Sequence, residues 1–247
     1  MITGLGLSSH IHCYSKALIL KALVYVANKC LVGAGLALMM LPIVGILKFF
    51  VTELIYFLAL IYVIVICIMG LLLILSSISF YSHGRRLGSA LGLTCAILIA
   101  IVGFGYVLSG YWTMAYMTNP NEASQLGLGI ATTIIRTSLF FYGFMSTFFF
   151  FETRSGELGG YGGILVLFFS SSTFFYVFFL EFIRTLPGAI FTLLASVGYV
   201  LQGVALDHIL SPPKFKYPPP SRRKYINLFG PAVGEYCQSP ELSKNSA

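Results

Sequence analysis

Long apolar segments, separated by short polar connectors, follow one another along most of the chain. Six of them approach the roughly 20 residues that a helix needs to cross a hydrocarbon core of about 30 Å. The pattern therefore predicts an all-α protein, a polytopic transmembrane helical bundle of about six spans with short connectors. In chain order the predicted spans are 31–47, 53–80, 88–117, 127–151, 161–180 and 188–206.

The first apolar segment differs from the others. It is short, and it contains Pro42, which removes a backbone hydrogen bond from a helix interior and predicts a kink or a partial crossing. If this segment does not cross, the count falls to five and the two termini lie on opposite sides. The preceding stretch, 16–29, spaces lysines among apolar residues. It is typical of an amphipathic helix at the membrane interface, or of a first span that extends into the headgroups with snorkelling lysines.

Three regions follow from these patterns. Residues 1–30 are a predicted cytoplasmic N-terminal segment with an interfacial amphipathic helix, and residues 31–206 are the transmembrane bundle. Residues 207–247 are a basic tail with seven prolines, which is typical of polyproline II or irregular chain. The tail's charge favours anionic lipid headgroups, or alternatively a docking site on a partner protein. Its candidate docking residues are Lys214, Lys216, Arg222, Arg223 and Lys224.

Composition and charge support the membrane interpretation. Of the 247 residues, 57% are hydrophobic and 9% are charged, a balance that a soluble domain would not carry on its surface. The net charge of +7 would suggest nucleic acid for a soluble protein, but here the basic residues lie beside apolar segments, so no nucleic-acid partner is expected. The expected surroundings are the lipid bilayer and other membrane protein subunits.

The distribution of basic residues predicts an orientation. With six spans, 12 of the 15 Lys and Arg residues lie on one side of the membrane and two on the other. By the positive-inside rule both termini are then cytoplasmic, or in the matrix if the membrane is mitochondrial. An endomembrane or the plasma membrane is expected, with the mitochondrial inner membrane as the alternative.

Residues that could carry chemistry are few. The five cysteines are scattered singly, and the four histidines, with Asp207 beside His208, match no metal-ligand motif in their spacing. No hydrolase or metalloprotease motif is present, and no pair of carboxylates lies within a predicted span. We therefore expect no catalytic residue, no metal and no cofactor, and a protein that is not an enzyme.

Small residues mark two candidate helix contacts. Gly88 and Gly92 have the GxxxG spacing that permits close helix crossings, although the 25 glycines of the chain produce such spacings readily by chance. Within 127–151, a helical period places Gly129, Arg136 and Gly143 on one stripe with several Thr and Ser residues. This stripe suits contact with other helices, so Arg136 is expected to face protein rather than lipid.

Two functions are consistent with these features. The first is a non-catalytic structural or accessory subunit of a larger membrane protein complex, favoured by the scarcity of polar groups in the spans and by the basic tail. The second is a small transporter or channel with a pathway lined by Arg136, which would suit an anionic solute.

Arg136 predicts an ion pair inside the membrane. At about 1.5 Å per residue it lies roughly 13 Å below the outer surface, and unpaired it would cost about 2.5–3.5 kcal/mol. Glu53 and Glu181 are the candidate partners, and Glu53 is favoured because Arg184 follows Glu181 by three residues, close enough to pair with it. We expect Arg136→Glu and Glu53→Arg each to lower thermal stability in detergent, and the double swap to restore part of it. If the double swap recovers nothing the pair does not form, and recovery with Glu181→Arg would name the other partner.

Overall fold

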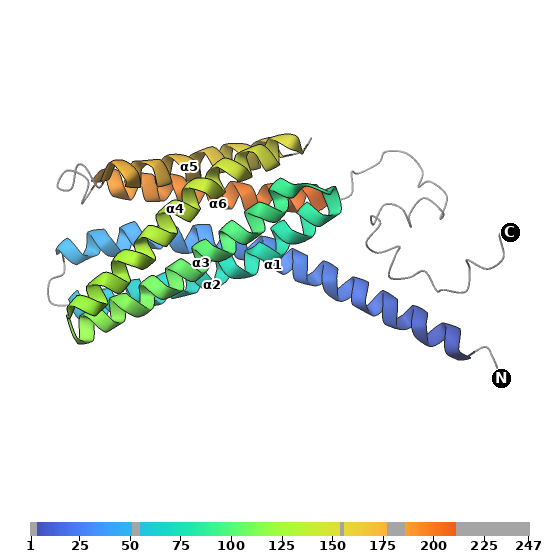
Figure 1. Cartoon of the computed structure of the whole chain (residues 1–247), viewed down its shortest axis with the longest axis horizontal. Helices are drawn as coiled ribbons and strands as arrows, with labels where there is room; N and C mark the ends of the chain where they lie inside the picture. The colour runs from blue at the N-terminus through green and yellow to red at the C-terminus, as the bar shows by residue number, and fades with distance from the viewer. Residues whose placement is uncertain (1–3, 51–54, 154–155, 177–185, 211–247) are drawn as a thin grey trace.

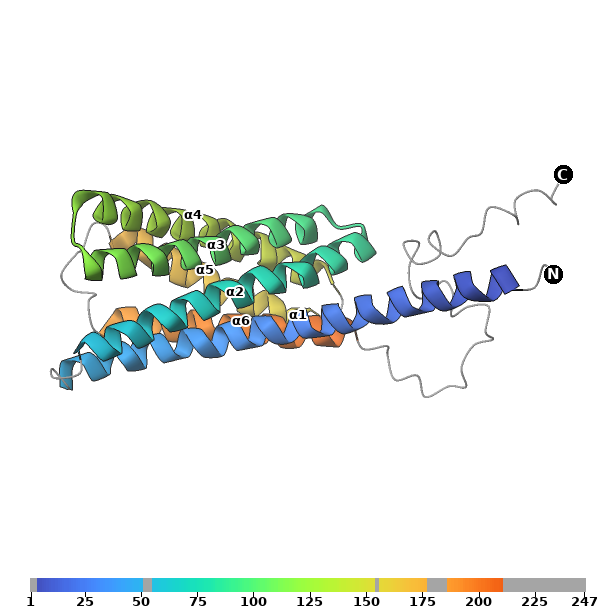
Figure 2. The ribbon, with the colours of Figure 1, turned by 90° about the horizontal axis from the view of Figure 1, so that it is seen from below.

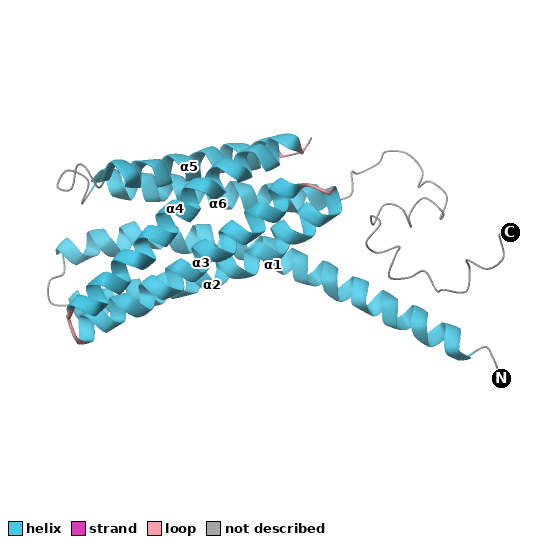
Figure 3. Cartoon of the chain, viewed as in Figure 1, coloured by secondary structure: helices cyan, strands magenta, loops and turns pink. Residues whose placement is uncertain are grey.

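A computed structural model describes residues 4–50, 55–153, 156–176 and 186–210 of the chain, and these residues form six α-helices without a strand (Figures 1 and 3). The predicted all-α helical bundle is therefore confirmed. The helices are α1 (Gly4–Phe50), α2 (Ile55–Leu87), α3 (Ala90–Thr118), α4 (Glu122–Glu152), α5 (Glu157–Tyr176) and α6 (Leu186–Leu210).

Five of the described helices contain segments long and apolar enough to cross a membrane. These segments are Lys21–Val44, Tyr56–Leu87, Ala90–Thr118, Glu122–Glu152 and Ile190–Ile209, and a shorter apolar segment covers Glu157–Ser170. By length and composition the chain is a multi-pass integral membrane protein.

The first helix is longer than any predicted span. It continues through Pro42 and joins the lysine-containing stretch 16–29 to the first apolar segment without a break. Helix α1 has 47 residues. Its N-terminal part projects beyond the other helices (Figures 1 and 2).

The helices form a closed ring. Each packs against the helix that follows it in the chain, and α1 packs against α6. Although α1 and α6 are far apart in sequence, the N-terminal half of α1, the α2–α3 turn and the end of α6 all lie toward the same end of the bundle (Figure 1). This end is called the α2–α3 end below.

Two short turns have well-defined local causes. Gly88 follows α2 with a left-handed backbone (φ 64°), which glycine adopts without strain. The amide of Ser89 donates to the carbonyl of Gly84 at 2.9 Å. Helix α4 begins with a capping box, in which the amide of Ser124 donates to Oδ1 of Asn121 at 2.8 Å and the amide of Asn121 donates to Oγ of Ser124 at 3.2 Å. Both turns place consecutive helices side by side and antiparallel.

Glycines bring the helix backbones close together. A methyl group at Gly103 on α3 would lie 2.5 Å from the carbonyl oxygen of Gly70 on α2, and one at Gly70 would lie 2.6 Å from that of Gly103. Gly162 on α5 and Gly198 on α6 have the same reciprocal relation, at 2.5 and 2.6 Å. Such contacts maximise van der Waals packing, which is a main source of helix association in a bilayer.

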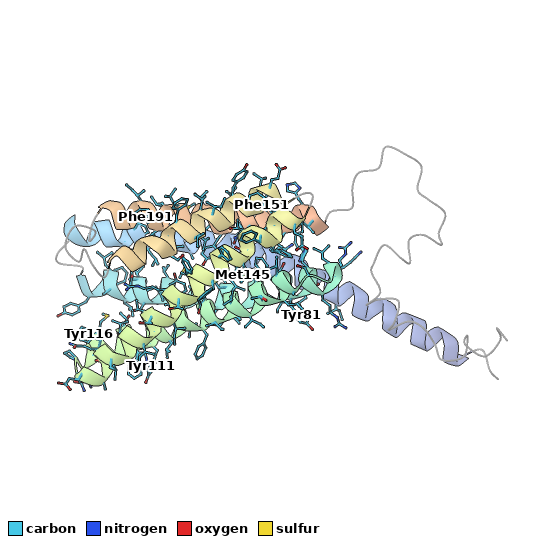
Figure 4. All side chains as sticks on the ribbon, turned by 45° about the horizontal axis from the view of Figure 1, so that its top comes forward. Tyr81, Tyr111, Tyr116, Met145, Phe151 and Phe191 are labelled. Atoms are coloured by element: carbon cyan, nitrogen blue, oxygen red, sulfur yellow. The ribbon has the colours of Figure 1, made fainter. Side chains whose placement is uncertain are left out.

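Large aromatic side chains fill the space between the helices. Phe80 on α2 lies among the rings of Tyr142, Phe149 and Phe150 on α4, with centroid distances of 5.7, 6.0 and 5.9 Å. All four side chains are fully buried. Other large apolar side chains point outward from the bundle, among them Phe151 (Figure 4).

The glycine contacts predict an asymmetric mutational response. Gly103→Ala should lower the free energy of unfolding by about 1–3 kcal/mol, because the new methyl group meets the backbone of Gly70. Gly129→Ala on α4 is the matched control, since nothing lies within 4 Å of that position. Removing a helical glycine there should leave stability equal or higher by about 0.5–1 kcal/mol. Thermal unfolding in detergent measures both, and equal effects at the two positions would contradict packing through Gly103.

Candidate functional site

Polar side chains are buried in the bundle on every helix. In a bilayer such groups need partners within the protein. Several serines donate to a carbonyl of their own helix, as Ser76 does to Leu73 at 2.7 Å and Ser196 to Leu193 at 2.6 Å. Among the described residues, two networks of buried side chains join different helices by hydrogen bonds, and these networks are the candidate functional site.

The first network joins α1, α2 and α6 and consists of Asn28, Lys29, Ser79, His83 and Asp207. Nδ2 of the fully buried Asn28 donates to Oδ1 of Asp207 at 2.9 Å, and the hydroxyl of Ser79 donates to Oδ1 of Asn28. The ammonium group of Lys29 forms an ion pair with the other carboxylate oxygen of Asp207. We call this set the α1–α2–α6 network.

His83 lies at the α2 side of this network, beyond the predicted apolar span 53–80, and is 1% exposed. Its Nδ1 is 2.7 Å from the carbonyl oxygen of Ser79 and 3.3 Å from the hydroxyl oxygen of the same residue. Because a carbonyl oxygen only accepts, we assign the proton of the neutral ring to Nδ1. Nε2 is then an acceptor, and it is buried with no hydrogen-bond partner among the described residues.

The second network joins α4 and α6 through the C-terminal third of each helix. The hydroxyl of Tyr142 donates to Oε1 of Gln202 at 2.6 Å, and Nε2 of Gln202 donates to the hydroxyl of Ser146 at 2.9 Å. Tyr199 stacks on Tyr142 with ring centroids 6.2 Å apart, and its buried hydroxyl has no partner within the part of the chain that the structure describes. We call this set the α4–α6 network.

The buried face of α4 differs from the stripe expected from small residues. Gly143 and Ser146 are buried, and the backbone of Leu167 approaches Gly143 closely, whereas Gly129 is exposed and Arg136 is half-buried. Large apolar and aromatic side chains take part in this face, so the expected stripe of small and hydroxyl-bearing residues covers only part of it. The buried residues of α4 are Ser124, Gly127, Ala131, Ile135, Ser138, Leu139, Tyr142, Gly143, Ser146, Phe149 and Phe150.

The two glycines with GxxxG spacing have separate places. Gly92 packs against Gly84 and the ring of Phe149, so a methyl group there would lie 2.6 Å from Cα of Gly84. Gly88 instead lies in the turn, with nothing within 4 Å. Gly88 and Gly92 therefore do not form a shared helix-contact surface, despite their GxxxG spacing.

Several expected site residues lie outside the described part of the chain. They are Glu53, Glu181, Lys214, Lys216, Arg222, Arg223 and Lys224. The pairing of Arg136 with Glu53 or Glu181 and the docking role of the tail remain predictions.

The residues that bond between helices carry little signal in the sequence. The apolar pattern assigns His83, Asn28 and Asp207 to connectors or terminal segments, although they lie within α2, α1 and α6. Gln202 is an amide surrounded by apolar residues in the predicted span 188–206. Such an amide in a membrane helix is itself a signal for a hydrogen bond to another helix.

The two networks offer hydrogen bonds and one ion pair as the polar chemistry of the site. Within the described residues no group of three or more His, Cys, Asp or Glu side chains is placed to hold a metal ion. Comparisons with protein-family models, curated proteins and solved structures found no match. The geometry of the bundle is therefore the basis for inferring function.

The α1–α2–α6 network predicts that Asp207 matters more to stability than its ionic partner. Asp207→Ala leaves the fully buried amide of Asn28 without its acceptor, which costs about 1–3 kcal/mol. Lys29→Ala removes a side chain that is 50% exposed, and such ion pairs contribute about 0–1 kcal/mol. Thermal unfolding in detergent compares the two variants.

Asp207→Asn separates the hydrogen bond from the charge. It retains an oxygen that can accept from Asn28, so its effect should lie between those of the two alanine variants. A loss at Lys29→Ala equal to that at Asp207→Ala would show that the ion pair, rather than the buried amide, dominates.

Proposed function

We propose that the protein is a non-catalytic multi-pass membrane protein that acts as a structural or accessory subunit of a larger membrane protein complex. The observation that carries this proposal is the filling of the bundle. The aromatic side chains that occupy the space between the helices are 0% exposed, namely Phe80, Tyr142, Phe149, Phe150 and Tyr199. A bundle filled in this way leaves its outer surface and its two ends to interact with other molecules.

The outer surface suits both lipid and protein neighbours. Large apolar side chains are exposed on it, including Phe104 on α3, Phe148 on α4 and Phe168 on α5. Lipid chains solvate such side chains, and helices of another subunit can pack against them. The lipid bilayer and other membrane protein subunits are accordingly the proposed partners.

The α2–α3 end is the proposed cytoplasmic or matrix end. Arg85 and Arg86 are exposed there, at the end of α2, in keeping with the positive-inside rule. Helix α6 ends there, and residues 211–247 follow it in the sequence. We propose that their basic residues dock on a partner subunit or on anionic lipid headgroups. An endomembrane, the plasma membrane and the mitochondrial inner membrane all fit this orientation.

The alternative is a small transporter or channel with an Arg136-lined pathway for an anionic solute. Arg136 is half-buried beside the face of α4 that packs into the bundle, while Tyr142 and Phe149 occupy that face. A pathway through the bundle would have to displace these aromatic side chains. The subunit proposal requires no such rearrangement.

Extraction in a mild detergent followed by native mass measurement tests the proposal. The 27.1 kDa chain should be recovered with other chains in a fixed stoichiometry. If the tail docks on a partner by its sequence, scrambling residues 211–225 at constant composition should abolish assembly, because only the charge is retained. The matched control is a scramble of residues 226–240, which contain no Lys or Arg.

Two outcomes would count against the subunit role, and a third would count against docking by the tail. Recovery as a monomer or a small homo-oligomer would contradict the subunit role. Uptake of an anionic solute by liposomes containing the purified chain, lost in Arg136→Gln, would establish the transporter instead. Unchanged assembly of the 211–225 scramble would exclude sequence-specific docking by that segment alone.

A further inference from the structure

Exposed tyrosines mark the two levels at which the bundle leaves the hydrocarbon. Helices α1 and α2 are antiparallel, and the hydroxyl of Ser79 bonds to Asn28. Tyr25 lies three residues before this contact on α1 and Tyr81 two residues after it on α2, so the two exposed rings are at nearly the same height. Tyr56 is exposed at the other end of α2, 25 residues or about 37 Å from Tyr81. This separation exceeds the hydrocarbon core of about 30 Å and is less than the full bilayer, so the tyrosines lie in the two membrane–water interfaces.

Two lysines of α1 lie on either side of the tyrosine at the α2–α3 end. Lys21 is four residues, about 6 Å, further from the middle of the bundle than Tyr25, and it is exposed. Lys29 is four residues nearer to the middle, and its side chain is 50% exposed beside Asp207. Its ammonium group lies 5.2 Å from the centre of the Tyr25 ring, so it extends toward the interface, as lysines near membrane boundaries do. Two positive charges and one carboxylate give this part of the surface a net positive charge.

Both lysines border the seam between α1 and α6. A methyl group at Gly35 would lie 2.7 Å from the carbonyl oxygen of Ser196, so the two backbones are in close contact there. Asn28, which bonds to α6, is seven residues before Gly35, and Lys21 is seven residues before Asn28. Residues seven apart lie on almost the same side of a helix. Lys21 therefore continues the line along which α1 meets α6, and Lys29 lies beside that line on the exposed side.

Apolar side chains continue the exposed border of the seam toward the middle of the membrane. On α1, Leu36 and Ile43 follow Lys29 at intervals of seven residues and are exposed. On α6, Val197 and Val204 are exposed, and each directly follows a residue that contacts α1. The seam thus presents cations at the interface and an apolar border within the hydrocarbon. A phospholipid has the same order, with a phosphate above two acyl chains.

We propose that the α1–α6 seam binds an anionic phospholipid of the leaflet at the α2–α3 end. Its phosphate lies at Lys21 and Lys29, and one acyl chain lies along Leu36 and Val204. An anionic headgroup fits these lysines better than a zwitterionic one, whose own cation would meet them. The proposal rests on the orientation given above in one respect, because anionic lipids are concentrated in the cytoplasmic leaflet. It does not depend on the subunit role or on the tail.

Lipid titration of the purified full chain in a non-ionic detergent tests the headgroup. Binding is measured by the rise in melting temperature with dioleoyl phosphatidylglycerol, dioleoyl phosphatidylcholine and inorganic phosphate. Phosphatidylglycerol should bind more tightly than phosphatidylcholine, and its binding should weaken with salt. Inorganic phosphate should have no effect at the same concentration, because it lacks the chains that the seam contacts.

Lys21→Gln removes one of the two cations and leaves the side chains of the α1–α2–α6 network unchanged. It should weaken phosphatidylglycerol binding about fivefold, the change expected from one basic residue near a membrane surface. Arg85→Gln is the matched control, since Arg85 is an exposed cation at the same height on α2, away from the seam. It should weaken binding by less than about twofold, because the charge at this distance is largely screened. The tail is intact in both variants, so any binding of its own affects them equally.

Photolabelling of the wild-type chain tests the position of the acyl chain. Phosphatidylglycerol with a diazirine in one acyl chain should label segments 36–43 of α1 and 197–204 of α6 in preference to segment 101–108 of α3. The α3 segment is a fair comparison because it carries the exposed side chains of Ile101 and Phe104. Excess unlabelled phosphatidylglycerol should suppress the label at the seam.

Four results would overturn the proposal. Equal binding of the two phospholipids would show that the lysines do not select the headgroup, and an equal effect of inorganic phosphate would show that the site takes the free anion. Lys21→Gln and Arg85→Gln variants that bind alike would remove the seam from the interaction. Even labelling of α1, α3 and α6 would show bulk lipid around the bundle rather than a bound molecule.

Discussion

The hydrogen bond from Asn28 to Asp207 joins the first helix to the last across 179 residues of sequence, and the ring of helices closes at this junction of α1 and α6. The other ring contacts connect helices that follow one another in the chain, whose connectors already keep them near each other. Among the ring contacts of the described helices, the α1–α6 contact is the one between helices that do not follow one another in the chain. Small residues assist it, since a methyl group at Gly35 would lie 2.7 Å from the carbonyl of Ser196 and one at Gly203 would lie 2.6 Å from the side chain of Val32. The closure therefore combines a buried polar pair with close backbone packing.

Glycines and aromatic residues divide the packing between them. Glycines lie where two helix axes approach, as at Gly70 and Gly103, and aromatic rings fill the wider space that remains, as Phe80 does. Neither could replace the other. A side chain at the close contacts would push the helices apart, and a small residue at Phe80 would leave an unfilled cavity, which costs several kcal/mol for a large aromatic side chain.

The helical class and the approximate order of the spans could be predicted because hydrocarbon thickness and backbone hydrogen bonding leave few solutions for long apolar segments. The residues at which the helices begin and end were harder to predict from the sequence. Helix α4 begins at Glu122 rather than near 127 because Asn121 and Ser124 form a capping box, and α1 continues through Pro42 because the helix tolerates the missing hydrogen bond. The buried face of α4 and the partners of Asn28 could not be predicted, since both depend on which helices meet, and that is a property of the ring rather than of any single segment.

Both polar networks converge on α6. Gln202 bonds to α4, and Asp207, five residues later, bonds to α1. Five residues correspond to about 1.4 helical turns, at about 3.6 residues per turn. The side chains of Gln202 and Asp207 therefore extend from different sides of α6. A stiff helix held at two adjacent points on different sides has little freedom to rotate or slide without breaking one of them. Helix α6 thus connects the two networks, and it ends at Leu210, three residues after Asp207.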